Sequence, residues 1–172
     1  MNNQFTIETI HKNVASEANN KKFNIIHFND VYSIEENDRD PKGGAARFVF
    51  LIEKLKNSTD IPTLVLFSGD AISPSNVSMI VKGKQMIEIL NACHLTCACL
   101  GNHDFDFGLE EIVKHIGNSN FPWLLSNVFE RETNRTLGHV PEKHIVQLDG
   151  IKVSIIKLIY VTKTQLLVGP FF

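Results

Sequence analysis

The sequence has few cysteines, and the three that it contains cannot form a closed set of disulfides because their number is odd. Cys93, Cys97 and Cys99 lie close together, and the last two alternate with Thr96 and Ala98 in an apolar stretch. Cysteine in such a stretch behaves as a small hydrophobic residue. Structural zinc is not indicated, since no fourth thiolate or imidazole lies at the usual ligand spacing. We therefore expect the three thiols to pack in the core.

The chain also lacks a strong charge of either sign. Its 17 Lys and Arg residues against 19 Asp and Glu residues give a net charge of -2. No basic block is present that would follow a nucleic-acid backbone. We therefore do not expect nucleic acid as a partner.

No apolar run is long enough to cross a bilayer. Lys152, Lys157 and Lys163 interrupt the apolar C-terminal part within a length that a membrane span requires to be uncharged. The first 22 residues are polar, rich in Asn and Lys, and lack the apolar centre of a secretory signal. We expect residues 1–22 to form a flexible tail, no membrane partner, and a cytoplasmic location.

What the sequence does contain is a repeated order of apolar run, polar turn and amphipathic stretch. Its 172 residues, 43% of them hydrophobic, suit one domain with a substantial core. The repeated order is typical of βαβ units. Strands are expected over residues 23–28, 63–67, 96–100 and 121–125. Three helices are expected: one that begins near Gly44, one over residues 84–91, and one over residues 109–116, where apolar residues form one face.

The pattern changes after residue 125. Residues 128–142 are polar and typical of a loop. The apolar runs 144–148 and 151–159 then flank Asp149-Gly150, which is a strong signal for a two-residue hairpin turn. The sequence therefore predicts an α/β fold of the order βαβαβαβ, followed by an antiparallel hairpin.

Three of the predicted strands end in carboxylate or amide side chains. The segments concerned are Asn29-Asp30, Gly69-Asp70 and Gly101-Asn102-His103-Asp104. The carboxyl ends of parallel strands open into one crevice, so we expect these residues to lie together. Asp30 or Asp70 alone is more often a helix cap or turn residue, and His103 beside Asp104 has the alternative of a structural hydrogen-bonded pair. As an ordered set of oxygen ligands beside an imidazole, they favour a site for Mg²⁺, Mn²⁺, Fe or Zn²⁺.

Five stretches of the sequence carry a resemblance to a known family. They are IIHFNDVY (25–32), KGGAARF (42–48), LVLFSGD (64–70), GNHDFDFG (101–108) and FPWLLSNV (121–128). Together they resemble the calcineurin-like metallophosphoesterases, and within them the 5′-nucleotidases. NDVY combined with FSGD and GNHDFDFG is similar to a eukaryotic and protist branch, some members of which are described as mannosylglucosyl-3-phosphoglycerate phosphatases. The resemblance covers about residues 23–159.

The resemblance implies a role for each matching residue. Asp30 would bind a first metal ion, Asp70 would bridge two ions, and Asn102 would bind the second. His103 would stabilise the transition state or protonate the leaving oxygen. Asp104 would orient His103, which a carboxylate beside an imidazole is suited to do.

The activity implied by this resemblance is hydrolysis of a phosphomonoester. Two divalent ions, of Mn, Zn, Mg or Fe, would activate a bridging hydroxide that attacks the phosphorus. The partner would be a small phosphorylated substrate, either a nucleotide or a sugar phosphate. A nucleotide-binding Rossmann domain is not indicated, because no Gly-x-Gly-x-x-Gly follows the first strand.

Two departures from the family pattern qualify these expectations. Most relatives have a metal-binding His two residues after the first Asp, where this chain has Tyr32. The family's later histidine segments have no counterpart here, and His115, His139 and His144 are interpreted as surface or turn residues. We expect residues 23–172 to be a truncated catalytic domain, a partial two-sheet sandwich whose C-terminal half is missing. Its exposed sheet surface would favour association with other chains. The alternative to a phosphomonoester hydrolase is a catalytically inactive module that acts only by binding.

A few residues near the motifs have two interpretations. Gly43 and Gly44 either bring the backbone close to the site or simply begin a helix. Arg47 either reaches an anion or lies solvated on its helix. Asn127 is either a turn former or a contact behind the metal ligands.

Overall fold

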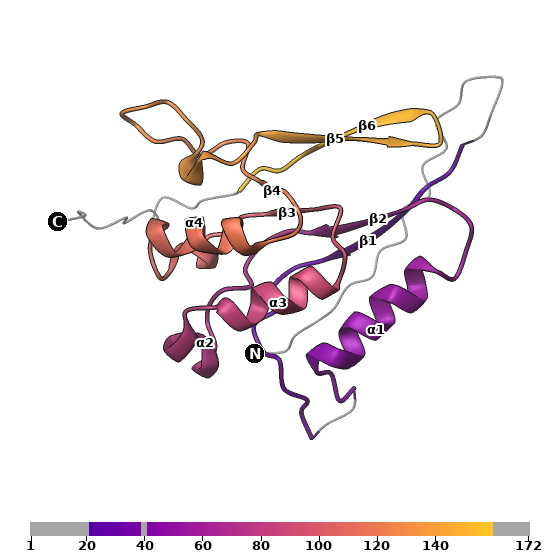
Figure 1. Ribbon diagram of the computed structural model, residues 1–172, viewed down its shortest axis with the longest axis horizontal. Helices are drawn as coiled ribbons and strands as arrows, with labels where there is room; N and C mark the ends of the chain where they lie inside the picture. Colours follow the sequence, from indigo (N-terminus) through magenta and orange to yellow (C-terminus); the bar gives the residue numbers. More distant parts are fainter. Residues whose placement is uncertain (1–20, 39–40, 160–172) are drawn as a thin grey trace.

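The computed structural model describes residues 21–38 and 41–159, which form a parallel sheet, helices and a separate hairpin (Figure 1). The α-helices and strands are β1 (Asn24–Phe28), α1 (Ala45–Lys56), β2 (Thr63–Phe67), α2 (Asn76–Val81), α3 (Lys84–Ala92), β3 (Cys97–Cys99), α4 (Leu109–Asn118), β4 (Trp123–Leu124), β5 (Lys143–Leu148) and β6 (Ile151–Ile156). Two short 3₁₀ turns, η1 (His103–Phe105) and η2 (Leu137–His139), complete the described elements. The α/β fold is confirmed.

The four strands of the parallel sheet lie in chain order, β1-β2-β3-β4. Crossover connections between parallel strands are right-handed, so a sheet that grows in one direction carries all of its crossover helices on one face. Figure 1 shows this arrangement, with α1, α3 and α4 on one side of the sheet and the β5–β6 hairpin on the other. Because the four strands are parallel, their carboxyl ends lie along the same edge of the sheet.

The main core fills the space between the sheet and the helices. Large apolar side chains from both layers are buried there, including Ile52, Phe67, Leu90, Ile112 and Trp123. The ring of Phe67 meets the ring of Trp123 edge-on, with 6.3 Å between centroids. Burial of such side chains stabilises the fold by about 1.5–3 kcal/mol each. This core fixes the positions of the strand ends.

A smaller core covers the opposite face of the sheet. Cys97, Cys99 and Leu124 pack there with Ile155 of the hairpin. The Nζ atom of Lys157 donates a hydrogen bond of 2.8 Å to the carbonyl oxygen of Ser68. The hairpin is thus attached to the sheet by apolar packing and by a lysine contact close to the end of β2.

The expected burial of the cysteines is confirmed. Cys93, Cys97 and Cys99 are free and buried. Burial raises the pKa of Cys93 and Cys99 to about 12 and that of Cys97 to about 11. The thiols therefore remain protonated at neutral pH and act as apolar core groups.

The predicted strands and helices agree with the structure to within three residues at their ends, whereas α2 and the two 3₁₀ turns were not predicted. The hairpin turns at Asp149 and Gly150, whose φ angles of 45° and 78° suit the predicted tight turn. The short helix α2 was not predicted, since a single six-residue helix gives too little periodicity to detect. Residues 1–20 of the expected tail, and residues 160–172, lie outside the described residues. None of the helices within the described ranges is both long and apolar enough to span a bilayer.

Candidate functional site

The loops that follow β1, β2 and β3 meet at one edge of the sheet. The amide of Asp30 donates to the carbonyl oxygen of Gly69 at 3.1 Å, and the amide of His103 donates to Oδ1 of Asp70 at 2.8 Å. Asp30 and Asp70 both have positive φ angles, 56° and 65°. Such a conformation is uncommon outside glycine and often occurs at functional positions. The three segments singled out by the sequence are therefore neighbours in space.

Two glycines permit this close approach. A Cβ atom on Gly101 would lie 2.1 Å from Oδ1 of Asp70, and one on Gly69 would lie 2.5 Å from the backbone nitrogen of Gly101. Contacts this short are sterically forbidden. The absence of a side chain at both positions is thus a requirement of the site, because it lets the Asp70 carboxylate lie against the loop that carries Asn102 and His103.

Asp104 is buried beneath these loops, with 1% of its surface exposed. Its Oδ1 accepts hydrogen bonds from the amides of Ala71 and Ile72 at 2.9 and 3.1 Å, and its Oδ2 accepts from Gly101 and Asp70 at 2.8 and 3.0 Å. Burial raises the pKa of Asp104, and the four amide donors oppose that rise because they stabilise the charged form. Asp104 therefore joins the loop after β2 to the loop after β3.

His103 is oriented by Asp106. Nδ1 of His103 lies 2.9 Å from Oδ2 of Asp106. Burial lowers the pKa of His103, but the hydrogen bond and charge of Asp106 outweigh this effect and raise the pKa. The expectation that Asp104 orients the imidazole is wrong, since its carboxylate is directed at backbone amides. Sequence reasoning missed Asp106, although residues at i and i+3 of a 3₁₀ turn lie on one face and the turn begins at His103.

Tyr32 and Asn29 hold the side chain of Asp30. The phenol of Tyr32 donates to Oδ1 of Asp30 at 2.5 Å, and the side-chain amide of Asn29 donates to Oδ2 of the same carboxylate. The Tyr32 ring also meets the imidazole of His103 edge-on, with 6.4 Å between centroids. Burial and the Asp30 hydrogen bond raise the pKa of Tyr32, so the phenol is a neutral donor. This geometry connects the loop after β1 to His103.

Negative charge accumulates where the loops meet. Burial, and then the neighbouring charge of Asp104, raise the pKa of Asp70 to about 6, with a further contribution from Asp30. The carboxylates of Asp30 and Asp70 and the exposed amide of Asn102 are hard oxygen donors, which suit a divalent cation. A cation would also relieve the repulsion that raises the Asp70 pKa. The donor set therefore fits part of a cation shell.

That donor set contains no complete cluster of ionisable ligands. Among residues 21–38 and 41–159, no three His, Cys, Asp or Glu side chains gather closely enough to hold a metal ion. Two features account for this: one expected ligand is an amide, and the Asp104 oxygens are used by the backbone. The three predicted ligands Asp30, Asp70 and Asn102 could thus provide only part of a two-ion site.

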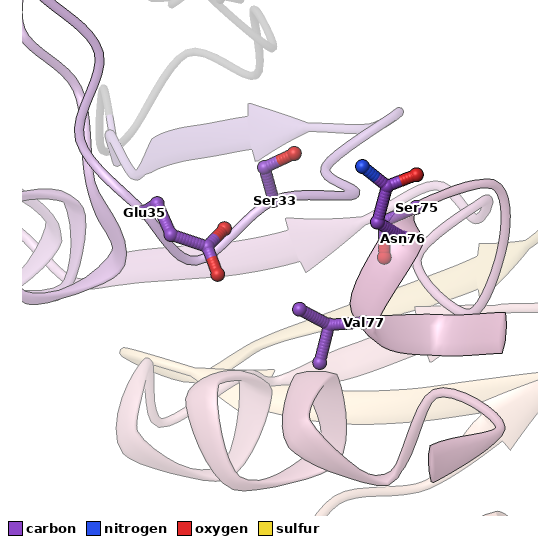
Figure 2. Close-up of a pocket in the computed structure, with 5 residues that line it drawn as sticks. All are labelled: Ser33, Glu35, Ser75, Asn76 and Val77. Atoms are coloured by element: carbon purple, nitrogen blue, oxygen red, sulfur yellow. The ribbon is translucent and has the colours of Figure 1, made fainter. Parts of the chain in front are cut away.

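An open cleft of about 350 Å³ lies between the segments that follow β1 and β2 (Figure 2). Its lining consists of Ser33 and Glu35 on one side and Ser75, Asn76 and Val77 at the start of α2 on the other. Ser75 caps α2, because its Oγ accepts from the amide of Ser78 at 3.0 Å. The described lining residues offer hydroxyl, amide and carboxylate groups beside the apolar Val77, and none of them is basic, so the lining suits a neutral ligand rich in hydroxyl groups.

Three further histidines, His115, His139 and His144, were interpreted as surface or turn residues, and the prediction for one of them is wrong. His115 is 5% exposed on α4, and its Nε2 lies 2.6 Å from the carbonyl oxygen of Lys82. It is a buried residue that links two helices. His139 lies in an exposed turn with φ 56°, as predicted, and its Nε2 is 3.3 Å from Glu130. His144 lies on β5.

The residues with two interpretations have structural contacts. Gly44 precedes α1 with φ 90°, which supports the interpretation that it begins the helix. Arg47 forms an ion pair with Glu36, both of them exposed. Asn127 exchanges two hydrogen bonds with the backbone of Ile159, at 2.8 and 2.9 Å. It therefore fixes the chain that leaves the hairpin.

Comparison with known proteins identifies the family. The model for calcineurin-like phosphoesterases matches residues 23–164, which is most of the chain. The chain belongs to this family. The resemblance of the five sequence motifs to this family is therefore confirmed, and the loops described above are the strand ends of a phosphoesterase fold.

Several relatives of the chain are 5′-nucleotidases. A snake venom 5′-nucleotidase of Gloydius brevicauda is 29% identical over 169 residues, which are 89% of this chain and 28% of the relative. The NAD 5′-nucleotidase of Haemophilus influenzae is 29% identical over 171 residues, 93% of this chain and 28% of the relative. The chain thus spans little more than a quarter of the length of these proteins.

Solved structures give the same result for the fold. The NAD nucleotidase of Haemophilus influenzae superposes with a TM-score of 0.71 and 28% identity, over 81% of this chain and 26% of that chain. A 5′-nucleotidase precursor from Thermus thermophilus superposes with a TM-score of 0.66 and 24% identity, over 78% and 28% of the two chains. The parallel sheet and hairpin therefore form part of a metallophosphoesterase domain.

Proposed function

We propose that the chain provides the first half of the active site of a metal-dependent phosphomonoester hydrolase of the 5′-nucleotidase type. The observation that carries the proposal is the meeting of Asp30, Asp70 and the Asn102-His103 segment at one sheet edge, with hydrogen bonds of 3.1 and 2.8 Å between the loops. Family membership and the nucleotidase relatives support the same reaction class.

Each side chain has a role that follows from its contacts. Asp30, Asp70 and Asn102 would hold divalent cations through oxygen atoms, together with ligands from outside the described residues. When bound, a pair of such cations supplies an activated water and screens the charge of the phosphoryl group. The imidazole of His103, held by Asp106 at 2.9 Å, would donate a proton or hydrogen bond to a substrate oxygen. Asp104 would keep the two loops in register.

The substrate would be a small phosphate ester with a hydroxyl-rich leaving group, such as a nucleotide or a sugar phosphate. The phosphate would lie by Asp30, Asp70 and Asn102. The hydroxylated part would enter the cleft lined by Glu35 and Asn76, which is formed by the same two segments that carry Asp30 and Asp70. Glu35 would accept hydrogen bonds from hydroxyl groups and would repel a second phosphate in the cleft.

The proposal is tested by phosphate release from AMP and from an aryl phosphate in the presence of Mn²⁺. We expect Asn102→Ala and His103→Ala each to lower kcat by about 100-fold or more, since a cation ligand and a proton donor each contribute on that scale. Glu88→Gln, on the exposed surface of α3, is the control and should keep full turnover. Equal turnover in the wild type and both site variants would remove this site from the reaction.

The alternative, an inactive module that acts by binding, makes a different prediction about metal content. Metal analysis after purification in excess Mn²⁺ separates the two. Mn²⁺ that the wild type retains and Asn102→Ala loses would support the hydrolase. No retained ion together with no turnover would support the inactive module.

A further inference from the structure

Tyr32 has two separate contacts in the site, one through its hydroxyl and one through its ring. The hydroxyl donates to Oδ1 of Asp30 at 2.5 Å. The ring meets the imidazole of His103 at 6.4 Å between centroids and an interplanar angle of 88°. These partners belong to different loops, after β1 and after β3. Tyr32 is therefore a bridge between a cation ligand and the imidazole.

The hydroxyl contact is suited to fixing the direction of the Asp30 carboxylate. Asp30 is exposed and has φ 56°, so neither packing nor a regular helix or strand restrains its side chain. A carboxylate held by two donors, here Tyr32 and Asn29, loses little rotamer freedom when a cation binds. Hydrogen bonds of this kind to a metal-binding carboxylate typically contribute about 10-fold to 100-fold in metal affinity, a range that gives the scale expected here.

The ring contact serves a different purpose. An edge-to-face pair prefers one mutual orientation, because the positive edge of one ring faces the negative face of the other. Asp106 restrains the imidazole through Nδ1 on one side, and the Tyr32 ring restrains it on another. Together they hold Nε2 of His103 in a fixed direction. A leucine in place of Tyr32 would remove both contacts, whereas a phenylalanine would remove only the hydrogen bond.

We propose that Tyr32 is a positioning residue with two separable roles, in which the hydroxyl orients Asp30 for a cation and the ring orients His103. The cation role rests on the function proposed above, since it takes Asp30 to be a ligand. The ring role rests on contacts within the chain alone. Tyr32 thereby acts on the reaction through Asp30 and His103.

The experiment compares Tyr32→Phe and Tyr32→Leu in the full chain by two readouts. Mn²⁺ affinity is measured by titration calorimetry, and the His103 ring is followed by proton NMR without metal, with its resonances assigned by their loss in His103→Gln. Tyr32→Phe should weaken Mn²⁺ binding about tenfold and keep the His103 chemical shifts. Tyr32→Leu should weaken Mn²⁺ binding similarly and move the His103 shifts toward those of an exposed imidazole.

Matched controls remove the corresponding groups far from the site. Ser58→Ala deletes an exposed hydroxyl after α1, and Phe50→Leu deletes an exposed aromatic ring on α1, and neither should change either readout. If Tyr32→Phe binds Mn²⁺ as tightly as the wild type does, the hydroxyl role is overturned and the ring role is not affected. Unchanged His103 shifts in Tyr32→Leu would overturn the ring role. No Mn²⁺ binding by the wild type would overturn the proposed function together with the hydroxyl role.

Discussion

Asp104 shows how one side chain can set the geometry of a site without facing the substrate. Its carboxylate accepts four backbone hydrogen bonds from the two loops that carry Asp70 and His103. Charged acceptors form stronger hydrogen bonds than neutral ones, and burial excludes competing water. The distance between the two loops is therefore fixed by this group.

Asp104→Asn is expected to destabilise the fold by about 2–4 kcal/mol, because the amide NH₂ would face two backbone donors and leave them unsatisfied. The free energy of unfolding in urea measures this loss. Asp106→Asn is the matched control: its side chain is 39% exposed, so stability should change little while phosphatase turnover falls. Equal stability of Asp104→Asn and the wild type would contradict the role of Asp104.

Gly101→Ala is expected to displace the carboxylate of Asp70, because the added Cβ would lie 2.1 Å from Oδ1. Mn²⁺ affinity should fall by about 10-fold or more, as it does when a ligand loses its orientation. Gly117→Ala on α4 is the control, since nothing lies within 4 Å of the added atom. If Gly101→Ala binds Mn²⁺ as tightly as the wild type does, the Asp70 loop can move without loss of Mn²⁺ affinity.

The sequence predicted which residues of the site lie together, but not all of their contacts. Asp30, Asp70 and Asn102 could be found because polar groups at the ends of parallel strands converge. The family resemblance implied Asp104 as the partner of His103, whereas the structure places Asp106 beside the imidazole. In η1 the side chain of residue 104 is buried, and residue 106 lies on the same side of the turn as the imidazole of residue 103. This arrangement depends on the local backbone conformation, which the pattern of apolar residues in the sequence does not reveal.

At the scale of elements, α4 holds the end of α2 in place through two contacts at Lys82. Nε2 of His115 meets the Lys82 carbonyl oxygen at 2.6 Å, and Glu111 pairs with Nζ of Lys82 at 3.0 Å. Lys82 has φ 52° and ends α2 in the left-handed conformation. This contact between elements keeps α2, and with it one wall of the cleft, attached to the helical layer.

The stability contribution of Glu111 is expected to depend on pH. Hydrogen bonds from Lys114 and Lys82 lower the pKa of Glu111 from its ordinary value of 4.5 to about 2. A lowered pKa in the folded chain means that ionised Glu111 stabilises the fold above about pH 4.5 and loses this effect as the pH falls to about 2. Unfolding midpoints of the wild type and Glu111→Gln should therefore differ at about pH 6 and converge toward about pH 2.

Two results would contradict this expectation: a constant difference over that pH range, or none at its upper end. Glu110→Gln provides the control. Its carboxylate pairs only with Lys114 among the described residues and is largely exposed, so the variant should differ little from the wild type at any pH.

Element prediction succeeded where periodicity was strong. Helices α3 and α4 have apolar residues on one face, and β2 is an apolar run entered through Pro62, so their positions follow from the pattern alone. Helix α2 leaves Met79 and Ile80 exposed, which destroys the amphipathic pattern. Its N-terminal cap, Ser75, was the one local feature that could have indicated it.

At the scale of the whole molecule, and within the residues that the structure describes, helices cover one face of the sheet and a two-stranded hairpin covers the other (Figure 1). The outer side of that hairpin exposes Ile145, Ile156 and, just beyond β6, Leu158, to 48%, 63% and 63%. Exposed apolar side chains on a two-stranded ribbon favour association with other chains. We therefore expect any self-association of the chain to involve these side chains.

We expect Ile145→Thr with Ile156→Thr to weaken self-association about 30-fold, since each exposed isoleucine that becomes buried between copies contributes about 1 kcal/mol. Threonine keeps the preference for a strand. Sedimentation velocity over a concentration series gives the association constant. Phe50→Ser, an exposed apolar residue on α1, is the control, and an equal effect of that variant would place the contact elsewhere.

The lysine that attaches the hairpin also has a mechanical consequence. Lys157 is bonded to the carbonyl oxygen of Ser68, and the peptide that follows leads through Gly69 to Asp70. Displacement of the β5–β6 ribbon would therefore displace the backbone two residues before Asp70. A partner bound to that ribbon would act on the Asp70 loop from the opposite face of the sheet.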